Sequence, residues 1–281
     1  MTLLALKQQL FTSLESHYPQ TEISSFFKII LEDLLNLSKI DFSLEPNAIV
    51  SEADKHKITE IIDGLKKEKP IQYLIGFTEF MDLKLYVNEQ VLIPRPETEE
   101  LVHWILDDFL QKPNLDVLDI GTGSGCIPIA LSKSLNQAFI DSMDISKQAI
   151  KTATINAKNN DAKINFIQQD ILTTNNLTRQ YDILVSNPPY VREQEKKEIK
   201  NNVLNHEPHL ALFVKDEDPL VFYKKIAELA KTSLKENGVL YYEINQYLGE
   251  ETVELMKQVG FSKIELKKDL FGNDRMIKAS R

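Results

Sequence analysis

Cysteine is nearly absent from this sequence, and long apolar runs and an excess of basic residues are missing as well. The single cysteine among 281 residues, Cys126, excludes a framework of internal disulfides and fits a reducing compartment. The longest apolar runs are far too short to span a bilayer, so we expect no membrane partner. The first residues, MTLLALKQQLF, lack a basic start and a small-residue cleavage site, so we expect no signal peptide. Together these absences predict a cytoplasmic protein.

The charge balance is acidic, with 33 basic and 42 acidic residues and a net charge of −9. Broad nucleic-acid binding needs a basic face, so these totals argue against direct binding of nucleic acid. A metal site is not expected either, because His103, His206 and His209 lack cysteine or acidic partners at ligand spacing. The composition is 42% hydrophobic, which is ordinary for a globular protein, and the chain is long enough for one large domain or two moderate ones.

Three sequence patterns follow one another along the chain. Up to about residue 70, apolar residues recur three and four positions apart, which predicts a small helical bundle, with Ser51 as an N-cap. From Pro70 to Pro96, apolar and polar residues alternate, which predicts short strands or a hairpin. From Asp116 onward, strands and helices alternate. This predicts an α/β fold with a mostly parallel sheet and helices on both faces.

The strongest local signal is DVLDIGTGSGCIPIA, in which a strand ends at Ile120 and a helix begins at Cys126. Glycines allow a tight turn and the close approach of a ligand, and a helix N-terminus offers free N–H groups. The spacing is G-x-G-x-G rather than the dinucleotide G-x-G-x-x-G. A tight loop without a ligand is the alternative. We predict instead a nucleoside cofactor with an amino-acid tail, S-adenosylmethionine, bound by Gly121, Thr122, Gly123, Ser124 and Gly125.

Two acidic residues end the next two predicted strands. Asp144, in MDIS, is positioned to accept hydrogen bonds from both ribose hydroxyls, although it also suits a helix N-cap. Asp170, in QQD, ends the third strand, where a carboxylate can accept a hydrogen bond from the exocyclic amine of adenine. The order of strand, glycine turn, helix, strand and aspartate supports the cofactor crevice more than either residue does alone.

The fourth strand, DILVS, is followed at once by Asn187, Pro188, Pro189 and Tyr190. Two prolines cannot continue a ladder, so a stiff turn lies at the carboxyl end of the strand, where open α/β sheets bind ligands. Asn187 Oδ1 and the Pro188 carbonyl could accept both protons of a planar NH₂ group while Tyr190 packs on its flat face. We predict that these four residues bind the methyl acceptor and position it for catalysis. A plain strand-terminating turn is the alternative.

Three further stretches have less specific patterns. Arg95, Glu97 and Thr98 lie on or after a stiff proline-flanked loop, and suit either the mouth of a site or a helix cap with a surface ion pair. Glu207, beside Pro208, is expected to orient the turn at 187–190. The charge run EQEKKEIK at 193–200 is interpreted as a solvated face.

Taken together, these motifs resemble the release factor glutamine methyltransferases. The resemblance covers nearly the whole chain. Its motifs are PIQYLIG at 70–76, VLIPRPETEELV at 91–102, DIGTGSGCI at 119–127, NPPY at 187–190, HEPHLAL at 206–212, ENGVLYYEI at 236–244 and DLFGNDR at 269–275. NPPY alone is shared by methyltransferases that act on adenine, cytosine and glutamine amides, whereas the set is highly specific.

This resemblance implies transfer of a methyl group to the glutamine of the Gly-Gly-Gln loop in class 1 peptide chain release factors. It also implies a helical domain at 1–72 that contacts the release factor, a β-hairpin linker at 73–96 and a seven-stranded, Rossmann-like methyltransferase domain at 97–281. Family cofactor contacts carry over to Gly121–Gly125, Asp144, Ile171 and Asn187. Ile171 replaces the usual aromatic residue, and Asn245 replaces the usual glycine after EI.

Two other enzymatic functions remain open. An adenine-N6 methyltransferase would use NPPY on a flipped base, although the acidic charge opposes it. A ribosomal-protein glutamine methyltransferase differs only in its target. A protein that binds S-adenosylmethionine without catalysis is a third alternative, and the intact NPPY motif argues against it.

Overall fold

The computed structural model describes residues 1–281 and divides them into two compact units. The first comprises Met1–Gly76 with Lys200–His206, and the second comprises Phe77–Ile199 with Glu207–Arg281. None of the helices combines the length and the apolar character that crossing a membrane requires.

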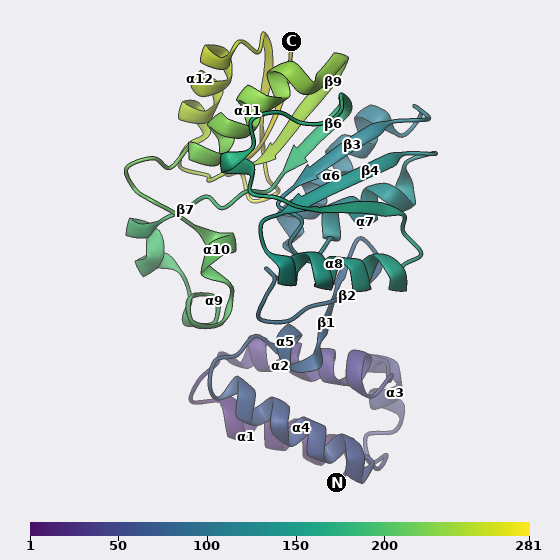
Figure 1. Ribbon diagram of the computed structural model, residues 1–281. Coiled ribbons are helices and arrows are strands. Elements are labelled where there is room, and N and C mark those ends of the chain that lie inside the picture. Colours follow the sequence, from purple (N-terminus) through teal and green to yellow (C-terminus); the bar gives the residue numbers. More distant parts are fainter. The chain divides into compact units, whose positions relative to one another are not determined.

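The first unit is helical, as the spacing of apolar residues predicts (Figure 1). Its helices are α1 (Leu3–Leu14), α2 (Gln20–Ile29), the π-helical turn η1 (Ile30–Leu34), α3 (Lys39–Leu44), α4 (Glu52–Leu65), α5 (Ile71–Ile75) and α9 (Asn201–His206).

Hydroxyl side chains fix the starts of these helices. Thr2 and Ser38 accept hydrogen bonds from the backbone of the first turns of α1 and α3. Ser51 accepts one from the Asp54 N–H at 3.1 Å, which confirms the predicted N-cap. Leucine and isoleucine side chains of α1, α2 and α4 then form one buried cluster with Ile71 of α5. The bundle is therefore held by an apolar core rather than by its marginal isolated helices.

Helix α9 belongs to this unit although it lies more than a hundred residues further along the chain. The His206 ring nitrogen Nε2 lies 2.9 Å from the carbonyl oxygen of Lys67. Asn201 donates a longer hydrogen bond, 3.5 Å, to the Glu68 carboxylate. The chain thus returns to the helical unit and leaves it again.

The hairpin expected between Pro70 and Pro96 is present, but it is shorter than the alternation suggested. It consists of β1 (Phe77–Phe80) and β2 (Leu83–Tyr86), which pair antiparallel. The residues before it form helix α5, which ends at Gly76 with φ 92°, a left-handed conformation that suits glycine. The residues after β2 carry no further strand.

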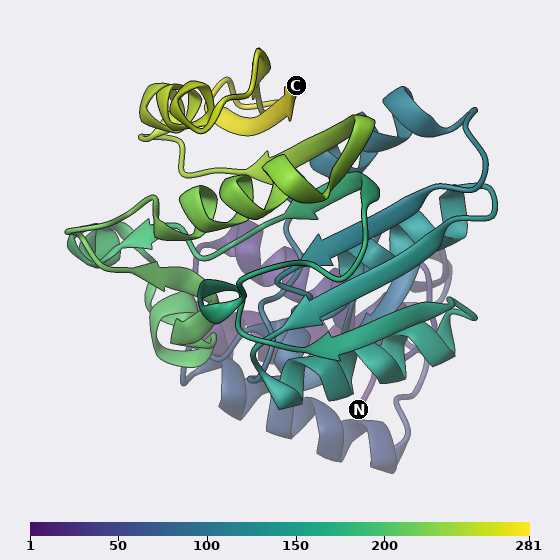
Figure 2. The same cartoon turned by 45° about the horizontal axis from the view of Figure 1, so that its top comes forward.

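The second unit contains a seven-stranded, mostly parallel sheet, as predicted (Figure 2). Its order is β10-β11-β9-β6-β3-β4-β5, with β11 antiparallel to both of its neighbours. The strands are β3 (Asp116–Ile120), β4 (Phe139–Asp144), β5 (Ile164–Gln168), β6 (Tyr181–Ser186), β9 (Leu234–Glu243), β10 (Lys263–Lys268) and β11 (Asp274–Ser280). A two-residue pair, β7 (Val191–Arg192) and β8 (Phe213–Val214), lies outside this sheet.

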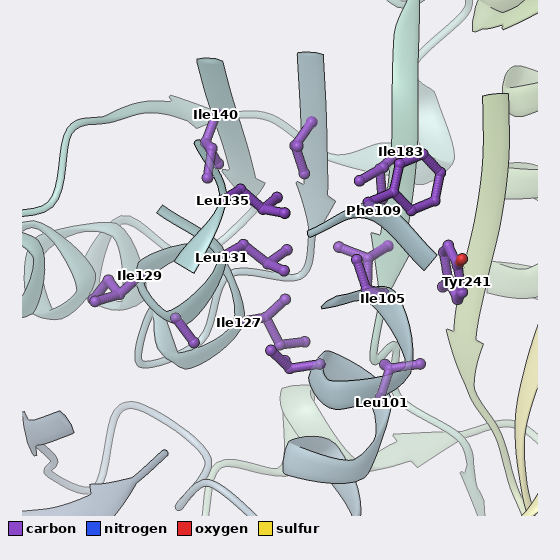
Figure 3. Close-up of a cluster of buried hydrophobic side chains, with 14 of the residues drawn as sticks. Leu101, Ile105, Phe109, Ile127, Ile129, Leu131, Leu135, Ile140, Ile183 and Tyr241 are labelled. Atoms are coloured by element: carbon purple, nitrogen blue, oxygen red, sulfur yellow. The ribbon is translucent and has the colours of Figure 1, made fainter. Parts of the chain in front are cut away.

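Alternate residues of the central strands bury against opposite layers of helices. Val117, Ile183 and Tyr241 pack with the first layer, whereas their neighbours in sequence pack with the second. Figure 3 shows the first layer, where side chains of α6 and α7 converge on those of the strands. This period of two explains how the strands stay buried on both faces.

Five helices pack on the sheet, namely α6 (Pro96–Phe109), α7 (Cys126–Ser134), α8 (Lys147–Asn159), α11 (Val221–Ser233) and α12 (Gly249–Val259). The unit also contains the 3₁₀ turns η2 (Ile171–Thr173) and η3 (Glu193–Glu198) and the short helix α10 (His209–Leu212). The predicted start of α7 at Cys126 is confirmed, and Ser146 caps α8.

Candidate active site

The glycine turn after β3 is held in a conformation that its sequence requires. Gly121, Gly123 and Gly125 have φ values of 89°, 54° and 84°, in the region that disfavours other residues. The N–H groups of Gly121 and Thr122 both donate to the carbonyl of Met143 at the end of β4. The turn is therefore fixed to the neighbouring strand before any ligand binds.

Asp144 connects this turn to the start of α8. One of its carboxylate oxygens accepts from the Gly123 N–H at 2.9 Å, and the other accepts from the Ser146 N–H at 2.8 Å. Burial raises the pKa of Asp144, and the backbone donors oppose that shift. Each oxygen retains a second lone pair for a ligand hydroxyl.

Asp119 lies just before the turn and is completely buried. Its Oδ2 accepts from the Ser142 hydroxyl at 2.6 Å, while Oδ1 has no donor in the protein. Burial raises the pKa of Asp119 from 3.8 to about 7, against the hydrogen bond from Ser142 and with help from the charge of Asp144. This carboxyl was not among the residues singled out from the sequence, although it is the last residue but one of β3, which leads into the glycine turn.

A cavity of about 360 Å³ opens beside the turn, within the size range of small-ligand sites. It brings together most of the predicted residues, namely Gly121, Thr122, Gly123, Ser124, Asp144, Asp170, Ile171, Asn187, Pro188 and Pro189. Gly125 and Tyr190 do not line it. Sequence reasoning missed Phe222 and Ile226 of α11 and Leu210 of α10, whose apolar character carried no site signal.

The residues present fit a nucleoside cofactor with a positively charged tail. The Ser124 hydroxyl lines the cavity, is buried and makes no hydrogen bond of normal geometry in the protein, although it interacts with the Cys126 thiol. Such a hydroxyl is available to a ligand. Asp144 and Asp170 add carboxylates to the wall, and Ile171 adds an apolar surface. Asp170 already accepts from the Leu172 N–H at 2.9 Å, as the cap of η2.

The turn at 187–190 follows β6 and reaches the same cavity. The Asn187 amide nitrogen donates to the Thr98 hydroxyl at 3.2 Å. The Tyr190 ring is half-buried, and its hydroxyl donates to Glu243 Oε1 at 3.0 Å. Thr98 donates to the other oxygen of Glu243 at 2.6 Å. Helix α6, the turn after β6 and the end of β9 thus meet around one buried carboxylate.

Glu243 is the residue of this group that the sequence did not reveal. It is 1% exposed and ends the buried strand β9. Burial raises its pKa, while the hydrogen bonds from Thr98 and Tyr190 and the charge of Arg275 oppose the shift. The sequence did offer one signal for Glu243 as a site residue, because it is an acidic residue at the end of the apolar run VLYYEI.

The hydrogen bonds of Glu207 go to the proline-flanked loop and not to the turn at 187–190, so they do not support its predicted role. Its carboxylate accepts from Arg95 at 2.6 Å and from the Ile93 N–H at 3.2 Å. It therefore anchors the proline-flanked loop, and Arg95 lines the cavity from there.

Asn245, and not Glu207, forms a hydrogen bond with the turn at 187–190, at its last residue, Tyr190. Its amide nitrogen donates to the Tyr190 carbonyl and to Glu195, both at 2.9 Å. Glu195 is 8% exposed and pairs with Arg192 at 2.7 Å. The interpretation of 193–200 as a solvated face is therefore wrong at Glu195, which points inward to this anchor.

Comparisons with known proteins agree on one family. The sequence model of the Methyltransferase small domain matches residues 102–211, and that of the PrmC N-terminal domain matches residues 5–76. The release factor glutamine methyltransferase of Flavobacterium psychrophilum is 51% identical over 98% of this chain and 97% of its own length. That of Bacteroides thetaiotaomicron is 43% identical over 96% of each chain.

Solved structures support the fold. The 16S rRNA N2 G1207 methyltransferase of T. thermophilus, determined with AdoMet and guanosine, superposes with a TM-score of 0.53. It covers 73% of this chain and 50% of its own, at 16% identity, so the likeness concerns architecture only. Because relatives of the same kind match almost from end to end, the chain belongs to the release factor glutamine methyltransferases, which use S-adenosylmethionine.

Proposed function

We propose that this enzyme methylates the side-chain nitrogen N5 of the glutamine in the Gly-Gly-Gln loop of class 1 peptide chain release factors. Its relatives are named for glutamine methylation of release factors. The observation that carries the residue-level proposal is the meeting of Asn187, Pro188 and Pro189 with the glycine turn and Asp144 in one cavity. A substrate that acts in translation also implies a cytoplasmic enzyme.

In this proposal the glycine turn, Asp144, Asp170 and Ile171 hold the cofactor. The Ser124 hydroxyl and the second lone pairs of Asp144 are available to it. When bound, S-adenosylmethionine supplies an electrophilic methyl group on a sulfonium. Ile171 offers contact but no ring for stacking, so adenine packs against an aliphatic wall.

Asn187 and Pro188 then act on the acceptor. An amide nitrogen is a weak nucleophile because its lone pair is delocalised. The Asn187 Oδ1 and the Pro188 carbonyl accept its two N–H protons and aim the nitrogen at the methyl group. These hydrogen bonds strengthen as positive charge develops on nitrogen, so they favour the transition state over the ground state. Fixing both reactants also supplies effective molarity. The proton leaves after transfer, which requires no general base beside the amide.

Tyr190 completes the acceptor site in this proposal. Its hydroxyl is tied to Glu243 and its ring is half-buried. Tyr190 does not line the cavity, so we propose that its ring contacts the amide at the edge of the site when the acceptor is bound. For the domains, we propose that residues 1–72 contact the release factor, that 73–96 form the linker and that 97–281 carry out catalysis. A tripeptide loop offers little area, so recognition of a whole factor needs such a second surface.

The test is transfer of a labelled methyl group from S-adenosylmethionine to four substrates. They are a class 1 release factor, the same factor with its loop glutamine changed to alanine, a ribosomal-protein fraction and DNA. We expect label on the first only. Label on the mutated factor or on ribosomal protein alone contradicts the target, and label on DNA as N6-methyladenine supports the adenine alternative.

A further inference from the structure

The chemistry proposed for Asn187 depends on which end of its amide faces the acceptor. A substrate NH₂ group can only donate here, so Asn187 must present Oδ1 and not Nδ2. The two ends have nearly the same shape, so packing alone cannot select between them. Something in the surroundings must therefore fix the direction of this amide.

Thr98 provides the local cause. It lies in the first turn of α6 and is 2% exposed. Its hydroxyl has a single proton, which it donates to Glu243 Oε2 at 2.6 Å. Toward Asn187 the same oxygen can then only accept, and the Asn187 Nδ2 lies 3.2 Å away. The donor end of the amide therefore points to Thr98, and Oδ1 points elsewhere.

Glu243 sets the direction of the Thr98 hydroxyl in turn. An ionised carboxylate accepts hydrogen bonds and donates none. Its second oxygen accepts from Tyr190 at 3.0 Å. Burial raises the pKa of Glu243, and the hydrogen bonds from Thr98 and Tyr190 and the charge of Arg275 oppose that shift. Hydrogen bonds from Tyr190 and Thr98 thus converge on Glu243, and the one from Asn187 to Thr98 follows the same direction.

We propose that Thr98 and Glu243 are positioning residues that lock the Asn187 amide with Oδ1 free for the substrate. The proposal rests on the function proposed above, since it assigns the orientation of the group that holds the glutamine. Neither residue has to touch the acceptor. Their effect is transmitted through the Thr98 hydroxyl proton.

A specific consequence distinguishes this lock from ordinary packing. Without the Glu243 carboxylate, the Thr98 proton needs another acceptor, and the Asn187 amide is already within hydrogen-bond distance. Donation to Oδ1 turns the amide around and presents Nδ2 to the substrate. Removing the Thr98 hydroxyl as well would free the amide. The second substitution should therefore repair part of the damage done by the first.

The experiment measures kcat at saturating S-adenosylmethionine with release factor as substrate, in five variants. Thr98→Val should lose about tenfold, the equivalent of one hydrogen bond, while Thr98→Ser should stay within about twofold because it keeps the hydroxyl. Glu243→Met should lose about 10²–10³-fold, as for a lost transition-state acceptor. The double variant Thr98→Val with Glu243→Met should recover to about the level of Thr98→Val alone.

Thr252→Val is the matched control for the threonine substitution. Thr252 is also fully buried in the first turn of a helix, and its hydroxyl donates to the Leu248 carbonyl at 2.6 Å. It should leave kcat unchanged. The Kd for S-adenosylmethionine and the melting temperature are measured for every variant, so that loss of cofactor binding or of folding is not mistaken for loss of orientation.

Two results would overturn the lock. One is a double variant as slow as Glu243→Met or slower. The other is Thr98→Val with wild-type kcat, which would mean that Thr98 only fills space. If Glu243→Met fails to fold, the two Thr98 variants still test the lock. A role in packing alone predicts that Thr98→Val keeps the higher kcat, whereas a role in orientation predicts that Thr98→Ser does. If the wild type does not methylate release factor at all, the proposed function fails first.

Discussion

Asp119 offers a quantitative test of the electrostatics around the glycine turn. Its carboxyl is completely buried and has a folded-state pKa of about 7, against an ordinary value of 3.8. Between these two values the folded protein holds a proton that the unfolded chain has released. The free energy of unfolding must therefore fall as pH rises through this window. Replacing Asp119 by asparagine removes the titration while keeping an acceptor for Ser142.

The size of the effect follows from the pKa difference. Each pH unit within the window changes the free energy of unfolding by about 1.4 kcal/mol. Most of the range between pH 5 and pH 8 lies inside the window, which gives about 2–3 kcal/mol. For a domain of this size, that corresponds to about 5–10 °C in melting temperature. The melting temperature of Asp119→Asn minus that of the wild type should rise by this amount from pH 5 to pH 8.

The assay is thermal unfolding of the ligand-free enzyme at several pH values, for the wild type, Asp119→Asn and Asp269→Asn. Asp269 is a buried carboxyl whose pKa is lowered: burial opposes this, but hydrogen bonds from the Asn273 N–H and Arg275 prevail. Its titration falls below pH 3.8, so its difference from the wild type should stay constant between pH 5 and pH 8. A constant difference for Asp119→Asn as well would refute the reasoning.

Substitutions at four further residues test the site. Asn187→Ala should lower kcat by about 10²–10³-fold, with a much smaller change in the Kd for S-adenosylmethionine. Single-turnover transfer measures the first quantity and calorimetry the second. Unchanged turnover with lost cofactor affinity would contradict this prediction. Asp144→Ala should chiefly weaken cofactor binding by calorimetry, with kcat near wild type at saturation. Gly125→Ala should lower the free energy of unfolding by about 1–3 kcal/mol in denaturant. The φ of Gly125 is 84°, and an added Cβ would lie 3.0 Å from the Cβ of Ala153. An unchanged midpoint of unfolding would count against this prediction. Asn245→Asp should lower the stability of the protein more than Asn245→Gly does, by about 1–3 kcal/mol. The reason is that the aspartate places an acceptor against the Tyr190 carbonyl and Glu195. Equal melting temperatures of the two variants would exclude this role of the amide.

Much of the fold could be predicted because its signals are local. The helical bundle follows from apolar residues three and four positions apart, and the start of α7 follows from the glycine turn before it. The glycine turn could also be predicted from the sequence, because positive φ angles at alternate positions require glycine, which few other contexts do. Helix α5 was missed because five residues are too few to establish a helical period.

The rest of the site depends on long-range pairing, which no local pattern encodes. Glu243 contacts Thr98 and Tyr190 only because β9 lies beside β6 in the sheet, with α6 packed near both. Asn245 was noted as a departure from the family's usual glycine, yet its contact with the Tyr190 carbonyl could not be inferred. Glu195 looked solvated because its neighbours in the charge run are, although its own side chain turns inward.

The return of the chain through α9 has a consequence for how this protein can be divided or recombined. The backbone passes between the two units at three places, after Gly76, after Ile199 and after His206. A single cut or a single genetic crossover near Gly76 would therefore separate α9 from the residues around Lys67 that it contacts. Exchange of the helical unit between homologous enzymes should require two segments to be replaced together. The helical unit is thus a discontinuous module, and chimaeras that ignore the second segment should lose the pairing of α9 with its own bundle.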